Sequence, residues 1–263
     1  MRTALREHWP EYLAEAAGLG AFMLSASCFA ALLFHPASPI ATLGLPPLAL
    51  RALMGLAMGG TAVALIYSPP GRRSGAHLNP AVTLTFWRLG KVRGDDAILY
   101  VVAQCLGGAA GMMIAAVAMP RLLSHPTVAY VVTVPGEAGV AAAWVAELVI
   151  SIGLMTAVLA VSSRPRLEAF TGLLAGALVA IYITLEAPIS GMSMNPARTL
   201  ASALPASTWT GFWIYLTAPP LGMLVAAEFH RRRGAPAPPC AKLRHDRAGR
   251  CIFRCSASQG GPA

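Results

Sequence analysis

The chain has 263 residues, of which 56% are hydrophobic and 12% are charged, and its formal net charge is +9. Soluble domains carry roughly 25% charged residues, so the composition excludes an ordinary water-soluble protein and indicates an integral membrane protein. The sequence contains no nucleotide-binding loop, no hydrolase nucleophile elbow and no zinc-binding helix motif. We therefore predict neither an enzymatic activity nor a cofactor.

The first prediction is a set of membrane-spanning helices, each of which needs about 20 apolar residues. Six apolar runs predict spans over residues 12–34, 48–67, 97–119, 141–161, 168–187 and 209–229. Residues 1–10 precede them as a short N-terminal segment. The first run is too long for a cleavable signal peptide and contains Glu15, so we expect it to be retained as a span.

An eleven-residue motif occurs twice between these runs. Residues 74–84 (SGAHLNPAVTL) and 190–200 (SGMSMNPARTL) are identical at seven positions. Asn is a favoured helix N-cap and Pro suits the first helical position. The motif therefore predicts two short helices, capped by Asn79 and Asn195. With its side-chain oxygen used in the cap, each Asn amide NH₂ is left to donate to a ligand at the positive end of a helix.

Both capped segments are too short to cross a membrane. They end near Arg88 and Pro205, so each has about ten residues and a length of ~15 Å. Half helices at corresponding positions of two repeats indicate a site at the membrane midplane. The predicted fold is an all-α membrane protein with six transmembrane helices, two re-entrant half helices and an inverted internal repeat. The channel domain covers residues 11–229, with repeats over about 11–120 and 140–229.

The basic residues predict the orientation of the chain. With a cytoplasmic N-terminus, the Lys and Arg residues outside the motifs lie inside, apart from Arg51 and Arg121. Both termini are therefore predicted in the cytoplasm, and the net charge needs no nucleic-acid partner. The compact loops suggest a bacterial inner membrane.

Two acidic residues repeat at the beginning of the first and fourth spans, as Ala14-Glu15 and Ala146-Glu147. Carboxylates inside a membrane are costly and normally mark a function. In a proton-coupled transporter they would act as relay groups.

Residues 230–263 form a tail of different composition, rich in Arg, Pro, Ser and Gly. This composition predicts a disordered cytoplasmic tail, which its arginines would attract to anionic lipid. The tail contains Cys240, His245, Cys251 and Cys255, but the Cys-x3-Cys spacing is loose for a metal site. We predict a reduced tail and no metal site.

The two motifs, with Arg198 after the second, resemble the signature loops of the major intrinsic protein family, which comprises aquaporins and glycerol facilitators. The resemblance covers residues 11–229. It implies a six-helix bundle in which both half helices fold inward, usually as a tetramer with one pore per subunit. The implied pore motifs are Asn79, Pro80, Ala81, Asn195, Pro196 and Ala197, and the implied pore-lining residues are Gly75, Ala76, His77, Gly191 and Ser193. In such proteins residues at the positions of Glu15 and Glu147 brace the pore loops, a role that we favour over proton relay.

The resemblance also implies a selectivity filter. Arg198 maps onto it with most certainty, and the other positions fall on Met192, Ile183 and either Met58 or Gly59. This set is more apolar than a strict water filter and fits a small polyol. Thr199, however, stands where glycerol facilitators usually carry Asp. Water, glycerol and other small neutral solutes all stay open.

The predicted function is a passive transmembrane channel for water or small neutral solutes such as glycerol, with protons and ions excluded. For His77 we favour a passive pore-lining or loop-bracing role over a pH gate. Two alternatives are a proton-coupled secondary transporter of a small solute and a non-conducting membrane structural protein with the same fold. The implied partners are the solute, the lipid bilayer and three further copies of the chain in a homotetramer.

Overall fold

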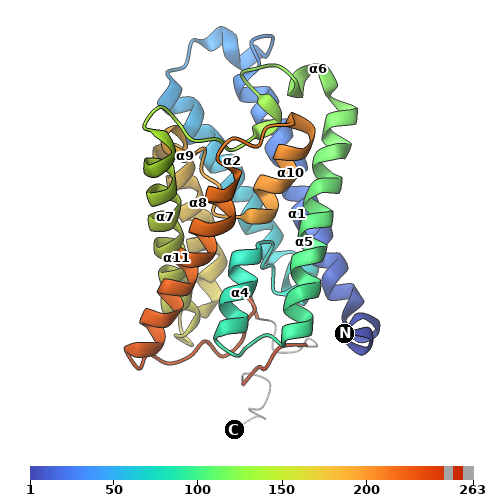
Figure 1. The fold of residues 1–263 in the computed structure, drawn as a ribbon, viewed down its shortest axis with the longest axis vertical. Coiled ribbons are helices and arrows are strands. Elements are labelled where there is room, and N and C mark those ends of the chain that lie inside the picture. Colours follow the sequence, from blue (N-terminus) through green and yellow to red (C-terminus); the bar gives the residue numbers. More distant parts are fainter. Residues whose placement is uncertain (246–250, 257–263) are drawn as a thin grey trace.

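The computed structural model describes residues 1–245 and 251–256, and all regular structure in these residues is helical (Figure 1). Six helical segments are long and apolar enough to cross a membrane, which confirms the six predicted spans. They are α1 (Arg2–Phe34), α2 (Pro47–Tyr67), α5 (Gly94–Ala118), α7 (Gly139–Ser162), α8 (Thr171–Leu185) and α11 (Phe212–Arg232). The span of α8 includes a preceding 3-10 turn, η3 (Glu168–Phe170).

The two predicted half helices are α4 (Pro80–Arg88) and α10 (Pro196–Ala206). Helices α1, α2, α4 and α5 form one repeat, and α7, α8, α10 and α11 form the other. Each half helix packs against the last long helix of the opposite repeat, α4 against α11 and α10 against α5 (Figure 1). Short elements complete the chain: α3 (Pro69–Ser74), α6 (Pro120–Leu123), α9 (Ala187–Ser190), η1 (Pro39–Leu43) and η2 (Ala129–Val131).

Glycines bring the long helices into backbone contact, as is common where helices pack in lipid. A Cβ atom added to Gly107 of α5 would lie 2.1 Å from the carbonyl oxygen of Ala16 in α1. A Cβ atom on Gly59 of α2 would lie 2.4 Å from the carbonyl oxygen of Gly176 in α8. Gly60 of α2 differs from Gly59 and Gly107, because a Cβ atom there would meet nothing within 4 Å.

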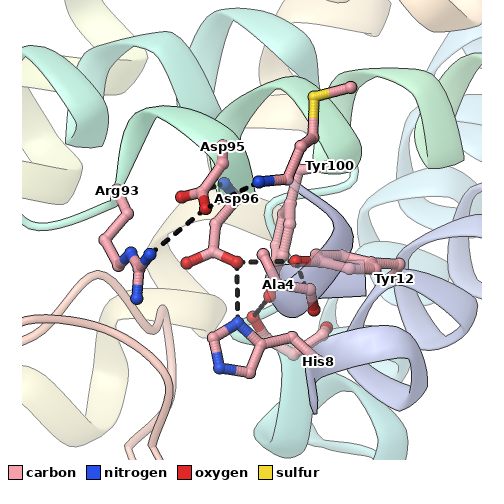
Figure 2. A network of polar contacts seen from close by, with 9 residues as sticks. Ala4, His8, Tyr12, Arg93, Asp95, Asp96 and Tyr100 are labelled. Carbon is pink, nitrogen blue, oxygen red and sulfur yellow. Dashed lines mark hydrogen bonds and ion pairs between the residues drawn. The ribbon is translucent and has the colours of Figure 1, made fainter. Parts of the chain in front are cut away.

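Helix α1 begins ten residues before the predicted span, and polar contacts hold this extension against α5. His8 Nδ1 and Tyr12 Oη each contact Asp96 Oδ1, at 2.7 and 2.6 Å (Figure 2). The contacts lie at the end of the bundle where α1 begins and α11 ends, which we call the terminal face; the other end is the opposite face (Figure 1). The predicted span was located from apolar residues alone, so it did not include this polar extension of the helix.

The helix contacts generate a matched pair of substitutions. Gly107→Ala is expected to lower the melting temperature of the purified protein, because the added methyl group meets backbone and overpacking costs about 1–3 kcal/mol. Gly60→Ala, the control, is expected to leave it unchanged, because the methyl group enters open space. Thermal unfolding in detergent checks both variants, and equal stability would contradict the proposed close contact of α1 and α5.

Candidate functional site

Asn79 and Asn195 cap the two half helices, as the sequence predicts. The Asn79 side-chain oxygen accepts a hydrogen bond from the Ala81 backbone N–H at 2.8 Å. The Asn195 side-chain oxygen accepts from the N–H groups of Ala197 and Arg198, at 3.1 and 3.2 Å. Pro80 and Pro196 are the first helical residues. Both side-chain oxygens are thus held by backbone, and only the amide NH₂ groups can face a ligand.

The two asparagines also connect the repeats to each other. Asn79 Nδ2 donates to the carbonyl oxygen of Met194, and Asn195 Nδ2 donates to that of Leu78, both at 2.7 Å. Each NH₂ group has two hydrogens, so one is used across the repeat boundary and one is left for a solute. The sequence-based interpretation had left both hydrogens for the ligand.

The loops that precede the half helices share an uncommon backbone. Residues two and four positions into each loop have left-handed φ angles: Ala76 (52°), Leu78 (49°), Met192 (50°) and Met194 (53°). Such conformations in non-glycine residues cost on the order of 1–3 kcal/mol each and persist only where the surroundings stabilise them. The loops therefore need strong partners in the bundle.

Glu15 is that partner for the first loop. Its carboxylate accepts hydrogen bonds from the backbone N–H groups of His77 and Leu78, at 3.0 and 2.6 Å. It also accepts from Ser74 Oγ at 2.7 Å and Gln104 Nε2 at 2.8 Å. Its oxygens thus have four donors, and the side chain is fully buried.

Glu147 holds the second loop in the same way. It accepts from the backbone N–H groups of Ser193 and Met194 and from Ser190 Oγ, each at 2.7 Å. A tyrosine supports each loop as well: Tyr100 Oη donates to the Ser74 carbonyl and Tyr215 Oη to the Ser190 carbonyl, at 2.7 and 2.5 Å. The sequence analysis missed both tyrosines, although each follows its motif at a similar distance.

One cavity of about 540 Å³ runs along the bundle past both asparagines. Its lining extends from Leu243 and His77 toward the terminal face to Phe34 and Arg51 toward the opposite face. Apolar side chains predominate, and the polar lining residues are Arg51, His77, Asn79, Thr127, Ser193, Asn195 and Arg198. Within the described residues no Asp or Glu lines the cavity.

Four of the five predicted filter residues line this cavity: Met58, Ile183, Met192 and Arg198. Of the two alternatives in α2, Met58 lines the cavity and Gly59 does not, because Gly59 faces Gly176 of α8. The position of Met58 in a filter stays a prediction. Among the described residues, Arg198 Nη1 is buried and has no hydrogen-bond partner, which leaves a donor for a solute oxygen.

The remaining predicted residues divide between the cavity and its walls. Ala76, His77, Gly191 and Ser193 line the cavity, whereas Gly75 does not. A Cβ atom on Gly75 would lie 3.1–3.2 Å from Phe253 and Lys242, so the C-terminal tail covers this glycine. Pro80, Ala81, Pro196 and Ala197 begin the half helices outside the lining.

Thr199 does not reach the cavity either. Its hydroxyl group contacts Ser193 Oγ at 2.5 Å and Thr133 Oγ1 at 3.0 Å, behind the second loop. Thr199 therefore contributes no group to the lining of the cavity.

Among the lining residues that the sequence analysis did not predict, one is charged and one belongs to the C-terminal tail. Arg51 lies in the first turn of α2 and donates from Nε to the Thr184 carbonyl at 3.0 Å; a charged residue inside an apolar run was the available signal. Leu243 belongs to the tail, and nothing in the tail composition places it at a cavity.

Comparison with known proteins gives one consistent result. The family described as "Major intrinsic protein" matches residues 3–230. Aquaporin NIP6-1 of Arabidopsis thaliana is 38% identical over 172 residues, which cover 65% of this chain and 54% of that protein. Aquaporin NIP3-1 of Zea mays is 37% identical over 66% of this chain and 57% of that protein. The chain thus spans about half the length of these relatives.

A solved structure shares the fold. The X-ray structure of the aquaglyceroporin from Plasmodium falciparum superposes with a TM-score of 0.68 at 22% sequence identity. The match covers 85% of this chain and 96% of that one.

The bracing contacts generate a second prediction. In Glu147→Gln an amide NH₂ faces N–H donors that now lack an acceptor, and each unsatisfied buried donor costs about 1–3 kcal/mol. We expect a lower melting temperature and less folded protein, with no new pH dependence of solute flux. The control Glu137→Gln alters an exposed residue and should match the wild type. A stable Glu147→Gln variant whose flux changes its response to pH would contradict the bracing role.

Proposed function

Because this chain belongs to the major intrinsic protein family, we propose that it is a passive transmembrane channel for water and small neutral solutes such as glycerol. The observation that carries the proposal is a cavity that runs past Asn79, Asn195 and Arg198, from the terminal face toward the opposite face. The family is one of channels, and an enzymatic role has no support in the site. The relatives compared above support a channel through their names, aquaporin and aquaglyceroporin.

The filter favours a polyol as well as water. Met58, Ile183 and Met192 line the same cavity as Arg198, the only charged member of the predicted filter. An apolar wall opposite a donor suits the carbon edge of a polyol, while its hydroxyl oxygens accept from the guanidinium group. Thr199 was the residue whose type did not match a glycerol facilitator, and it lies behind the second loop. We therefore include glycerol among the solutes.

The charges along the cavity support exclusion of cations and protons. The N-termini of α4 and α10 meet at the asparagines, and each carries roughly half a positive elementary charge. Arg51 and Arg198 add two guanidinium groups to the cavity lining. Fixed positive charge of this kind is a recognised barrier to protons and cations in channels. Glu15 and Glu147, the candidate relay groups of a transporter, are occupied by loop donors instead.

The orientation and assembly follow from the same premise. We propose that the terminal face is cytoplasmic, because the Lys and Arg residues gather at the loops and the tail of that face. We further propose a homotetramer in the lipid bilayer with one pore per subunit. A bacterial inner membrane stays a prediction, since the relatives named above with curated sequences come from plants.

Stopped-flow light scattering on proteoliposomes tests the function. Vesicles with the protein are expected to shrink faster than empty vesicles in an impermeant osmolyte and to reswell faster in a glycerol gradient. Fast shrinkage without faster reswelling would restrict the channel to water. Saturable, gradient-coupled uptake would indicate a transporter instead, and rates equal to those of empty vesicles would indicate a non-conducting structural protein.

A substitution in the filter tests proton exclusion. Arg198→Val removes the buried guanidinium group, so we expect faster proton entry into vesicles while water flux is retained. A pH-sensitive dye inside the vesicles measures the entry. Arg121→Val removes an exposed cation outside the cavity and is expected to behave as wild type. Equal proton entry in both variants would place the barrier at the half-helix ends alone.

A further inference from the structure

The C-terminal tail gathers four potential metal ligands in one place. Cys240, His245, Cys251 and Cys255 each present one ligand atom, and these four atoms all lie within 4.8 Å of one another. Cys240 Sγ and Cys251 Sγ are 3.4 Å apart, and Cys255 Sγ is 3.2 Å from His245 Nε2. None of the three thiols forms a disulfide in the part of the chain that the structure describes, so a disulfide does not explain the cluster. We propose that these residues bind one Zn²⁺ ion, and that the ion holds the tail over the mouth of the cavity.

The ligand set and its spacing fit zinc. Structural zinc sites are tetrahedral and use Cys and His ligands, including sets of three Cys and one His. With Zn–S bonds of about 2.3 Å and a Zn–N bond of about 2.0–2.1 Å, the ligand atoms of a regular tetrahedron lie about 3.5–3.8 Å apart. The closest pairs here fall slightly below that range and the widest above it, so small side-chain movements would complete the site. The Cys-x3-Cys spacing that seemed loose in the sequence does not prevent the approach.

Backbone N–H groups of the loop contact two of the sulfur atoms that would bind the metal. The backbone N–H group of Lys242 donates to the Cys240 sulfur, and that of Phe253 donates to the Cys251 sulfur. Each of these contacts comes from a residue two positions along the chain, so the loop itself supplies them.

Residues next to the proposed ligands pack on the terminal face of the bundle. The Ala241 carbonyl accepts from His77 Nε2 at 2.9 Å, and the Leu243 N–H group donates to the Gly75 carbonyl at 3.1 Å. Phe253 stacks on His77 with ring centroids 5.5 Å apart. These contacts join the tail to the first pore loop. In the described part of the tail, these contacts differ from the predicted disorder, because packing on His77 and Gly75 gives apolar tail residues a surface to cover. For residues 246–250 and 257–263 the prediction lies outside the described residues.

Leu243 connects the proposed metal site to the cavity. It lines the cavity next to His77 and is 6% exposed, while its neighbours Ala241 and Lys242 are also buried. Among the described residues the segment from Cys240 to His245 has no helix or strand, so its shape depends on its anchors. A zinc ion that closes this loop would keep Leu243 in the mouth. This consequence for flux rests on the proposed channel function, whereas zinc binding does not.

Zinc binding is tested first, on the full chain in detergent without a polyhistidine tag. The protein is equilibrated with ZnCl₂ alone, desalted and analysed for metal by mass spectrometry, and its thiols are counted. We expect about one zinc ion per chain, and binding at least about tenfold weaker in Cys251→Ser and in Cys255→Ser. The control Cys105→Ser alters a thiol in α5, far from the cluster in the chain, and should retain zinc.

Flux is tested second, on the same variants in vesicles. A chelator is expected to raise the water permeability of wild type and of Cys105→Ser. It should have no effect on Cys251→Ser, because the water permeability of that variant is expected to be high without the chelator. Leu243→Ala keeps all four ligands, so we expect it to retain zinc and to show high permeability with or without the chelator.

The outcomes separate the two proposals. Absence of zinc would overturn the metal site, as would equal zinc content in Cys251→Ser and wild type. A thiol count two below the number of cysteines in the sequence would indicate a disulfide and would also overturn the site. Zinc binding together with a basal flux that neither the chelator nor Leu243→Ala changes would overturn the role at the mouth. Zinc binding in a protein without flux in any variant would count against the channel function while it supports the metal site.

Discussion

The whole structure depends on the rule that backbone polar groups inside a membrane must find partners within the protein. The loops before α4 and α10 cannot meet this requirement with helical hydrogen bonds, since their N–H groups have no helical acceptor. Glu15 and Glu147 supply the acceptors, and the tyrosines of α5 and α11 bond the carbonyl of the serine that opens each motif. Two costly buried carboxylates are thereby used to hold open a path that a continuous helix would fill.

The cavity lies at the boundary of the two repeats. Each asparagine caps its own half helix and donates to the loop of the other repeat. Each half helix also packs on the last long helix of the opposite repeat. The cavity is therefore a joint product of both halves, and its positive field comes from two helix ends that neither repeat provides alone. Small residues at the helix crossings permit this interlocking, since side chains there would force the backbones apart.

The tail adds chemistry of a different kind at one mouth. Its proposed ligands are sulfur and imidazole groups that can bind a metal ion, whereas the asparagines and Arg198 of the cavity offer N–H donors to a neutral solute. Ala241, Leu243 and Phe253 interlock with the first pore loop, which Glu15 braces from behind. The position of the tail and the shape of that loop are thus parts of one contact network at the terminal face.

The sequence by itself determined the spans, the half helices, their caps and the repeated acids, because these depend on local hydropathy, spacing and residue type. Only the tertiary structure decided that Met58 and not Gly59 faces the cavity, since one residue of register turns a helix by about 100° and neighbouring packing selects the face. The tertiary structure was also needed to find the reciprocal hydrogen bonds of the asparagines, the orientation of Thr199 and the packing of the tail on His77. Each of these joins residues far apart in the chain, and their proximity comes from packing that no local pattern encodes.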